Sequence, residues 1–483
     1  MHSMTRRQFG KTTAAAAALA GTGLPRFSFA QSGADGHASG RKFPEGFVWG
    51  CATAAYQIEG GVHDGGRGQT DWDVFSHTPG KIFNNENGDV ADDSYHLYKE
   101  DIQLLKNLGV RGYRMSIAWA RIFPEGKGEP NPAGLDYYNR VIDELLANNI
   151  TPYVTLFHWD LPQALPGGWQ SRDTSYTYAD YAGFMARRLS DRVKHFMTTN
   201  EFTCFTDIGY REGRFAPGLR LPDGPANQVR HYGILAHGLG VEAIRAHAQG
   251  DVQVGLAENA KVFVPVIEDD ANIEAARRAT RILNAPFLTA LMEGKYLDIY
   301  LEHEGANAPR VEPGDMKTIG SPLDFVGLNI YDPNYVRASD SPLGFTVERL
   351  QSSYPHMASP WLNIGPECLY WGPRNVCDLW HPKAIFITEN GCSADDVITA
   401  EGRIEDTDRV MFLRNYLTHL HRATAEGYPV KAYFLWSLLD NFEWADGYSK
   451  RFGLHYVDFA TEKRTPKLSA EWYRQVIAQN AVV

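Results

Sequence analysis

The sequence predicts an α/β fold, namely a single (β/α)8 TIM barrel with inserted loops. Three observations predict it: eight short apolar runs, amphipathic segments between most of them, and the lack of a linker, low-complexity run or charge block after residue 40 of the 483 residues. Strands that alternate with helices form parallel sheets, and eight such units in about 440 residues indicate a closed barrel with insertions. The longest insertion is expected after the sixth strand, at roughly 332–382.

The expected strands share runs of apolar and β-branched residues, which are typical of strands buried on both faces. They are 47–57, 110–119, 151–159, 193–201, 252–260, 323–331, 383–391 and 430–438. Helical spacing of apolar residues predicts helices over 94–109, 135–149 and 408–427. The first of these helices ends on Gly109, a residue that favours the left-handed conformation of a C-terminal cap.

The N-terminus reads as a targeting segment. Arg6 and Arg7 precede a weakly apolar, alanine-rich run, and Ser28-Phe29-Ala30 has the small-x-small pattern of a cleavage site. Residues 1–30 thus resemble a bacterial Tat export signal; the alternative is a disordered basic tail. We expect a short flexible segment at 31–42, a catalytic barrel domain at 43–483, and a periplasmic or secreted protein.

Composition excludes several classes of partner. The formal net charge is −11, and removal of residues 1–30 leaves 43 basic and 58 acidic residues, which argues against nucleic acid and anionic membranes. No other segment approaches 18 uninterrupted apolar residues, so we expect no membrane span. The five cysteines lack metal-binding spacing. The sequence leaves open whether Cys368 and Cys377 form a disulfide.

Polar side chains gather at the ends of the expected strands. In a barrel of this kind function lies at the carboxyl ends of the strands, and buried polar groups are costly unless something binds them. Six strand ends on one rim therefore indicate a site, formed by Gln57, Arg114, His158, Asn200 with Glu201, Asn329 with Tyr331, and Glu389.

Two of these residues are carboxylates. Glu201 ends one strand and Glu389 ends the apolar run AIFITENG, on strands that can face each other across a barrel mouth. A pair of carboxyl groups performs glycoside hydrolysis, in which one protonates the leaving oxygen and the other attacks carbon or activates water. The alternatives are two independent surface acids, or, for Glu389, a solvated strand end before an Asn-Gly turn.

The motifs around these residues resemble glycoside hydrolase family 1, the β-glucosidase family. The resemblance runs from about Phe43 to Tyr473 and is carried by FVWGCATAAYQIEG, YRMSIAWARIFP, TLFHWDLPQAL, TTNEF, GLNIY, ITENG and LWSLLDNFEWADGYSKRFGLHYVDF. It implies a retaining enzyme without cofactor or metal, whose two carboxyls lie roughly 5 Å apart.

The resemblance also implies roles for individual residues. Glu389 matches the nucleophile and Glu201 the general acid/base, whose pKa should be raised by Glu389 and by burial. Arg114 matches an arginine that keeps the nucleophile ionised, and Tyr331 a tyrosine that hydrogen-bonds it. Asn200 is expected to hold the sugar 2-hydroxyl.

A pocket for the terminal sugar is implied in the same way. Its residues are Gln57, His158, Trp159, Asn329, Trp436, Glu443, Trp444 and Phe452. A cis peptide is expected between Trp436 and Ser437. Taken singly, His158 reads more readily as a satisfied core histidine, while packing is an alternative for Trp436 and a strand-end cap is one for Asn329.

Three positions depart from the family pattern. Phe202 stands where proline usually follows the acid/base, which adds bulk and restores a backbone N–H behind Glu201. Thr199 stands where phenylalanine is common, and Ile330 where tyrosine is usual. We expect Phe202 to alter the aglycone side or the setting of Glu201.

The sequence therefore predicts a β-glucosidase that releases terminal non-reducing β-D-glucosyl residues from a small β-glucoside or a cello-oligosaccharide. Alternatives on the same site are β-galactosidase, β-fucosidase or transglycosylase activity. An alternative from another class is a non-catalytic periplasmic sugar-binding protein. Loops at 211–228 and 332–382 should shape the aglycone side.

Overall fold

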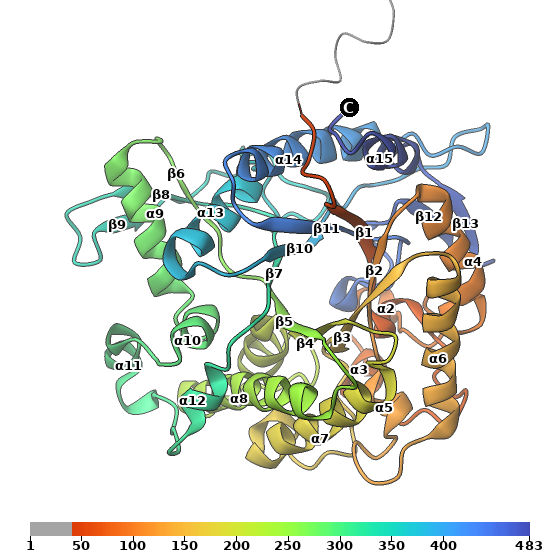
Figure 1. Cartoon of the computed structure of the whole chain (residues 1–483), viewed down its shortest axis with the longest axis horizontal. Coiled ribbons are helices and arrows are strands. Elements are labelled where there is room, and N and C mark those ends of the chain that lie inside the picture. Colours follow the sequence, from red (N-terminus) through yellow and green to blue (C-terminus); the bar gives the residue numbers. More distant parts are fainter. Residues whose placement is uncertain (1–40) are drawn as a thin grey trace, which may run out of the picture. The chain divides into compact units, whose positions relative to one another are not determined.

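All eight expected strands form, and they close into one barrel in the computed structural model, which describes residues 41–483 (Figure 1). Each strand pairs in parallel with both neighbours, and β1 closes the barrel by pairing with β2 and β11. The expected fold class is confirmed. The strands are β1 Val48–Ala52, β2 Gly112–Ser116, β3 Thr151–Phe157, β4 His195–Asn200, β5 Gln253–Glu258, β7 Val326–Asn329, β10 Ile385–Asn390 and β11 Val430–Trp436.

Helices surround the barrel (Figure 1). The predicted helices at 94–109 and 408–427 form almost as expected, whereas the one at 135–149 begins earlier, because Asn131 caps its first turn and Pro132 suits the first helical position. The longer helices are α4 Ser94–Leu108, α6 Pro132–Ala147, α7 Arg172–Leu189, α8 Asp223–His247, α9 Asp270–Leu283, α13 Cys368–Trp380, α14 Thr407–Ala425 and α15 Leu468–Gln479. The shorter ones are α2 Ala55–Ile58, α3 Asp71–Ser76, α5 Trp119–Ile122, α10 Leu288–Glu293, α11 Asp298–Glu304, α12 Asp315–Ile319 and the π-helix η3 Cys204–Glu212.

The barrel interior is filled by side chains that alternate along the strands. On β11, Ala432, Phe434 and Trp436 belong to the interior cluster, whereas Tyr433 and Leu435 pack in the layer between barrel and helices. Since successive side chains of a strand point to opposite faces, both faces of each strand are buried, which explains the continuous apolar runs. The interior is thus a packed core, and a site is left to its carboxyl end.

The insertions carry two small sheets. The predicted long insertion at 332–382 contains β8 Asn334–Ala338 and β9 Phe345–Val347. β8 pairs with both β9 and β6 Phe263–Pro265, and this three-stranded sheet packs against α9. A hairpin of β12 His455–Asp458 and β13 Lys463–Pro466 follows the last barrel strand.

One expectation of local structure, the extent of the first strand, is wrong. The first strand ends at Ala52, because the Ser116 hydroxyl accepts a hydrogen bond from the Ala55 N–H at 2.7 Å and α2 begins there, so Gln57 lies on a short helix. The disulfide left open does not form, and all five cysteines are free. Cys368 and Cys377 lie nine residues apart on α13, which separates their Cα atoms by about 13 Å, too far for a bridge.

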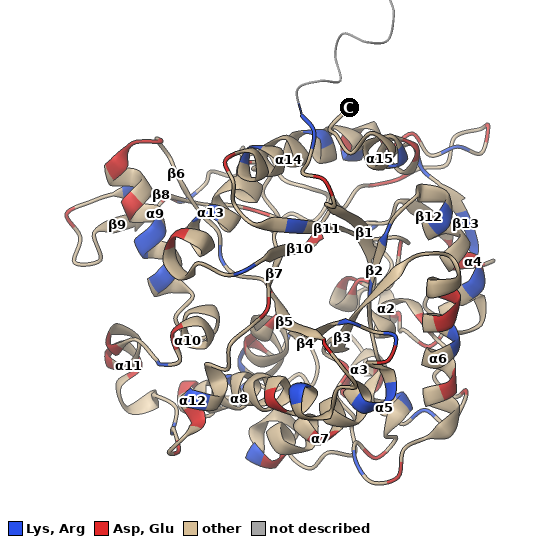
Figure 2. Cartoon of the chain, in the orientation of Figure 1, with Lys and Arg blue, Asp and Glu red and all other residues tan. Residues whose placement is uncertain are grey.

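Charged residues of both signs are interspersed over the outer helices, for example on α4, α6 and α9 (Figure 2). Within residues 41–483, no helix combines the length and apolarity needed to cross a membrane. The expected export signal and most of the expected flexible segment lie outside the described residues.

Candidate active site

A cavity of about 900 Å³ opens at the carboxyl end of the barrel. Two residues of the predicted site, Arg114 and Asn200, are fully buried and do not line it. The other predicted residues meet at this cavity, although they come from strands and loops along the whole chain. They are Gln57, His158, Trp159, Glu201, Asn329, Tyr331, Glu389, Trp436, Glu443, Trp444 and Phe452.

Register shifts in two strands direct the carboxyl groups toward the cavity. The pairing of β10 with β7 shifts between Ile387 and Glu389, and the pairing of β4 with β5 shifts before Asn200. In a regular strand, neighbouring side chains point to opposite faces, whereas a register shift can turn two consecutive side chains to one side. Thr388 and Glu389 accordingly both contact residues of the site.

Glu389 is held by a cation and a phenol. Its Oε1 accepts a short hydrogen bond from the Arg114 guanidinium, and its Oε2 accepts one from the Tyr331 hydroxyl at 2.8 Å. Burial raises the pKa of Glu389, while Arg114 and Tyr331 act in the opposite direction because both stabilise the charged form. The lowering effect expected of Arg114 is present, but burial outweighs it.

Glu201 has donors without a formal charge. Asn329 donates from Nδ2 to Glu201 Oε1 at 2.6 Å, and the Cys204 thiol donates to Oε2 at 3.1 Å. Burial first, and then the nearby Glu389, raise the pKa of Glu201 to about 7. Since Arg114 contacts Glu389 directly, the site favours Glu201 over Glu389 as the carboxyl that holds a proton.

An amide network fixes the remaining polar groups. The side-chain oxygen of Asn200 accepts from Arg114 at 2.5 Å and from Asn329 at 3.0 Å, so its amide nitrogen donates to His158 Nε2 at 3.1 Å. Burial lowers the pKa of His158 well below its usual value. The ring is therefore neutral with its proton on Nδ1, an atom without a hydrogen-bond partner in the described structure.

The expected sugar pocket contains a carboxyl and an amide side by side. Gln57 donates from Nε2 to Glu443 Oε2 at 3.3 Å, while its own side-chain oxygen is buried and has no partner among the described residues. Burial, Asp446 and the two catalytic-site carboxyls raise the pKa of Glu443 well above its usual value. A neutral Glu443 can both donate and accept a hydrogen bond.

Aromatic rings form the walls of this pocket. The rings of Trp159 and Trp444 lie 4.4 Å apart between centroids, and His158 lies nearly parallel to Trp436 at 6.0 Å. Phe452 meets Tyr331 edge-on at 6.2 Å. The peptide between Trp436 and Ser437 is cis, as the sequence predicts.

The departures from the family pattern have defined surroundings. The Phe202 ring is fully buried and stacks on Phe287 at 5.7 Å, and its N–H donates to Glu258 Oε2 at 3.0 Å. Thr199 is buried with an unpartnered hydroxyl within residues 41–483, and Ile330 packs in the core.

Sequence reasoning missed three residues of the site, namely Cys204, Glu258 and Trp361. Cys204 contacts Glu201 from η3, Glu258 ends β5, and Trp361 lies half-exposed on the cavity rim in the 332–382 insertion. Glu258 could have been predicted, because it is an acidic residue near the end of the predicted strand 252–260. The other two carry no local signal.

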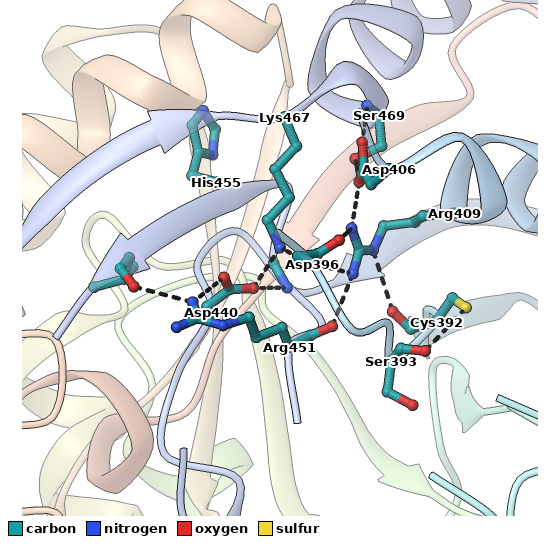
Figure 3. A network of polar contacts seen from close by, with 12 residues as sticks. Cys392, Ser393, Asp396, Asp406, Arg409, Asp440, Arg451, His455, Lys467 and Ser469 are labelled. Atoms are coloured by element: carbon teal, nitrogen blue, oxygen red, sulfur yellow. Dashed lines mark hydrogen bonds and ion pairs between the residues drawn. The ribbon is translucent and has the colours of Figure 1, made fainter. Parts of the chain in front are cut away.

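A buried charge network supports the loops behind the pocket (Figure 3). Lys467 Nζ lies 2.5 Å from Asp396 and 2.6 Å from Asp440, and the Arg409 guanidinium contacts Asp396 and Asp406. Asp396 follows β10, and Asp440 follows β11, in the loop that contains Glu443 and Trp444. The network thus ties together the two loops that follow the strands nearest to the pocket.

A closed parallel barrel with two buried, differently paired carboxyl groups at its carboxyl end is the arrangement that glycoside hydrolases of this fold use. The model of glycosyl hydrolase family 1 matches residues 39–482, and the chain belongs to this family.

The chain is similar to several named proteins over most of its length. A 1,4-β-D-glucan glucohydrolase of Thermotoga neapolitana is 43% identical over 92% of this chain and 99% of its own length. A bifunctional β-D-glucosidase/β-D-fucosidase of Bifidobacterium breve is 42% identical over 91% of this chain and 99% of its own length. The structure of the family 1 β-glucosidase from Thermotoga maritima superposes with a TM-score of 0.85 at 40% identity and covers 93% of this chain and 100% of its own. That enzyme has also been solved with glucoimidazole bound.

Proposed function

We propose that the protein is a retaining β-glucosidase that hydrolyses terminal non-reducing β-D-glucosyl residues. The observation that carries the proposal is the unequal pairing of two buried carboxyls: Glu389 faces a guanidinium and a phenol, and Glu201 faces an amide and a thiol. An ionised nucleophile beside a protonated acid is the arrangement that glycosidic cleavage with retention requires.

In the first step Glu389 attacks the anomeric carbon while Glu201 protonates the glycosidic oxygen, so the aglycone leaves as a neutral alcohol. The Glu389 carboxylate becomes an ester of the sugar, and its negative charge disappears. Since that charge helped to raise the pKa of Glu201, Glu201 is then a better base. In the second step Glu201 takes a proton from water, which attacks the anomeric carbon and frees Glu389.

The sugar itself is bound by two groups without a partner among the described residues and by a carboxyl with hydrogen-bonding capacity to spare. Gln57 offers its side-chain oxygen, His158 offers its Nδ1 proton, and neutral Glu443 can accept or donate. These groups suit a ring with several hydroxyls, and Trp436 offers an apolar face to it. The same groups can bind the axial 4-hydroxyl of a galactoside or fucoside, and the name of the Bifidobacterium relative supports a test of the fucoside.

The aglycone side supports an oligosaccharide or an aryl group. Trp361 lies on the cavity rim with half of its surface exposed, and exposed tryptophan faces stack on sugar or aryl rings. We therefore include cello-oligosaccharides among the substrates.

The test is hydrolysis of nitrophenyl β-glucoside, β-galactoside and β-fucoside by the wild type, Glu389→Gln and Glu201→Gln, with the anomer of the first product read by NMR. We expect β-glucose to be released first, and a loss of about 10³-fold or more in kcat for Glu389→Gln. Activity confined to another glycoside would change the specificity and keep the mechanism. An α-anomer, or an unimpaired Glu389→Gln variant, would overturn the proposal, and so would binding of glucosides without turnover.

We also propose export through the twin-arginine route, supported by Arg6, Arg7 and the small-residue pattern that ends at Ala30. The test compares the full chain with an Arg6→Lys/Arg7→Lys variant and an Arg26→Lys control in a bacterial host. Periplasmic activity should disappear in the pair variant alone. Equal export of all three would contradict the proposal.

A further inference from the structure

The backbone on both sides of Glu201 is tied to the end of β5. The Glu201 N–H donates to the Ala257 carbonyl at 2.8 Å, and the next N–H along the chain, that of Phe202, donates to the Glu258 side chain at 3.0 Å. Glu201 itself has a positive φ of 48°, a conformation that non-glycine residues adopt when their surroundings impose it. Two consecutive residues of β5 therefore hold the two amides that flank Glu201.

Glu258 is buried beside these amides, with 2% of its surface exposed. The charged and titratable groups around it are Glu201 on the tip of β4, and Cys204 and Asp207 on η3. Asp207 is already neutralised by Arg230 of α8, which contacts both of its oxygens at 2.6 and 2.8 Å. No cation in the described structure pairs with Glu258, and burial raises its pKa to about 8.

We propose that Glu258 is a positioning residue for the acid/base: its uncharged carboxyl accepts the Phe202 N–H and so fixes the backbone that aims the Glu201 carboxyl at the glycosidic oxygen. A buried N–H needs an acceptor, and the helix that begins at Phe202 supplies none for its first N–H groups. The inference rests on the proposed function, because it needs Glu201 to act as the proton donor.

The proposed role requires the Glu258 carboxyl to be uncharged. An ionised Glu258 would stabilise the protonated form of Glu201 through like-charge repulsion, and its removal would lower the pKa of Glu201. An uncharged acceptor has no such effect. Glutamine reproduces the uncharged acid, since its amide oxygen can accept the same N–H, whereas leucine removes the acceptor and keeps the volume.

The experiment measures kcat/KM against pH for Glu258→Gln and Glu258→Leu, on a 2,4-dinitrophenyl β-glucoside and on a methyl or nitrophenyl β-glucoside. A good leaving group needs little protonation, so a misaimed Glu201 should affect only the poorer one. We expect kcat/KM of Glu258→Leu to fall roughly tenfold on the substrates with poorer leaving groups and less than about threefold on the dinitrophenyl substrate. For Glu258→Gln, kcat/KM should stay within about twofold of the wild-type value on both substrates, and the alkaline limb of its pH profile should not move.

Two further variants separate positioning from folding. Val254→Ala removes buried volume from the same strand outside the site, so it reports the effect of lost stability alone. The Phe202→Pro variant has no backbone N–H at residue 202 for Glu258 to bind, and proline is tolerated in a first helical turn. When Glu258→Leu is added to this variant, kcat/KM on the poorer leaving groups should therefore fall by less than about twofold.

The results test three claims separately: the uncharged acceptor, the positioning of Glu201 and the proposed function. A Glu258→Gln variant that loses as much as Glu258→Leu, or whose alkaline limb moves to lower pH, overturns the role of an uncharged acceptor. If Glu258→Leu loses kcat/KM equally for all leaving groups, or loses as much in the Phe202→Pro variant as in the wild type, Glu258 does not position Glu201. Glu201→Gln is measured alongside: if it shows no dependence on the leaving group, the proposed function itself fails, and the inference falls with it.

Discussion

Each carboxyl of the site has a neutral donor that tunes its acidity, Cys204 for Glu201 and Tyr331 for Glu389. A hydrogen bond to the charged form of a carboxyl lowers its pKa, so each donor opposes the effect of burial. The two donors act on opposite limbs of the pH profile, since Glu201 must be protonated and Glu389 ionised.

The Cys204→Ala variant should move the alkaline limb of kcat/KM to higher pH. The proton of Glu201 is lost as pH rises through about 7, and without the thiol the carboxylate is less stable, so the proton stays on longer. The measurement is the pH profile on a nitrophenyl β-glucoside.

The control is Cys204→Ser, which retains a donor and should leave the limb close to its wild-type position. Cys368→Ala, a buried cysteine on α13, should also leave it in place. A shift to lower pH in the alanine variant would show that the thiol does not donate to Glu201.

The Tyr331→Phe variant should reduce kcat/KM by roughly 10- to 100-fold, because a hydrogen bond to a charged group is worth about 1.5–3 kcal/mol. The loss of the 2.8 Å contact should also raise the pKa of Glu389 and move the acidic limb to higher pH. A full pH profile checks both effects. An unchanged acidic limb would indicate that Arg114 alone sets the acidity of Glu389.

At the scale of elements, the strands and their polar ends could be predicted, but contacts between ends could not. Periodicity places Glu201 and Glu389 at strand ends because a strand buried on both faces is continuously apolar up to the cavity. The register shifts that direct Glu389 inward depend on pairing with β7 and leave no trace in the local sequence. The position of Glu258 at a strand end is visible in the sequence, but its partner is not, since that partner is a backbone N–H 56 residues away.

The loops after β10 and β11 depend on Lys467, which lies between Asp396 and Asp440. Lys467→Met keeps most of the volume but removes the cation that two buried carboxylates share, which leaves Asp396 with Arg409 alone and Asp440 with Arg451 alone. Removal of one partner of a buried pair typically costs 3–5 kcal/mol, so we expect a loss of about that size in the free energy of unfolding. KM for the glucoside should also rise, since the second loop contains Glu443 and Trp444.

The matched control is Arg337→Gln, which breaks an ion pair with Glu348 on the exposed face of β8. An exposed pair contributes about 0–1 kcal/mol, so this variant should unfold near the wild-type denaturant concentration. Equal stability of the two variants would mean that the buried network of Figure 3 does not support the loops.

Over residues 41–483, several buried or half-buried titratable groups that have no ion-pair partner favour their uncharged form. Burial raises the pKa of Glu201 and Asp332 to about 7 and that of Glu258 to about 8. Burial also lowers the pKa of His237 to about 3 and that of His455 to about 4. The two sets act on stability in opposite directions and in different ranges of pH.

The stability of the protein should therefore fall as the pH rises from about 6.5 to about 8.5. A carboxyl whose pKa is raised on folding stabilises the protein below its unfolded value near 4, and that stability is lost as pH rises through the folded pKa, here about 7 to 8. A histidine whose pKa is lowered destabilises only below its unfolded value of about 6.5, so histidines do not oppose this loss at alkaline pH.

Thermal unfolding at pH 6.5 and 8.5 checks this expectation, and a decrease of a few degrees, roughly 2–4 °C per kcal/mol or less for a chain of this size, is expected. Glu258→Gln cannot ionise, so the difference between the two pH values should become smaller in that variant. If the melting temperature rose with pH over this range in the wild type, the carboxyls would have to be ionised in the folded state. The protonated Glu201 that the mechanism needs would then lack its physical basis, which makes the unfolding profile a test of the active site as well as of the fold.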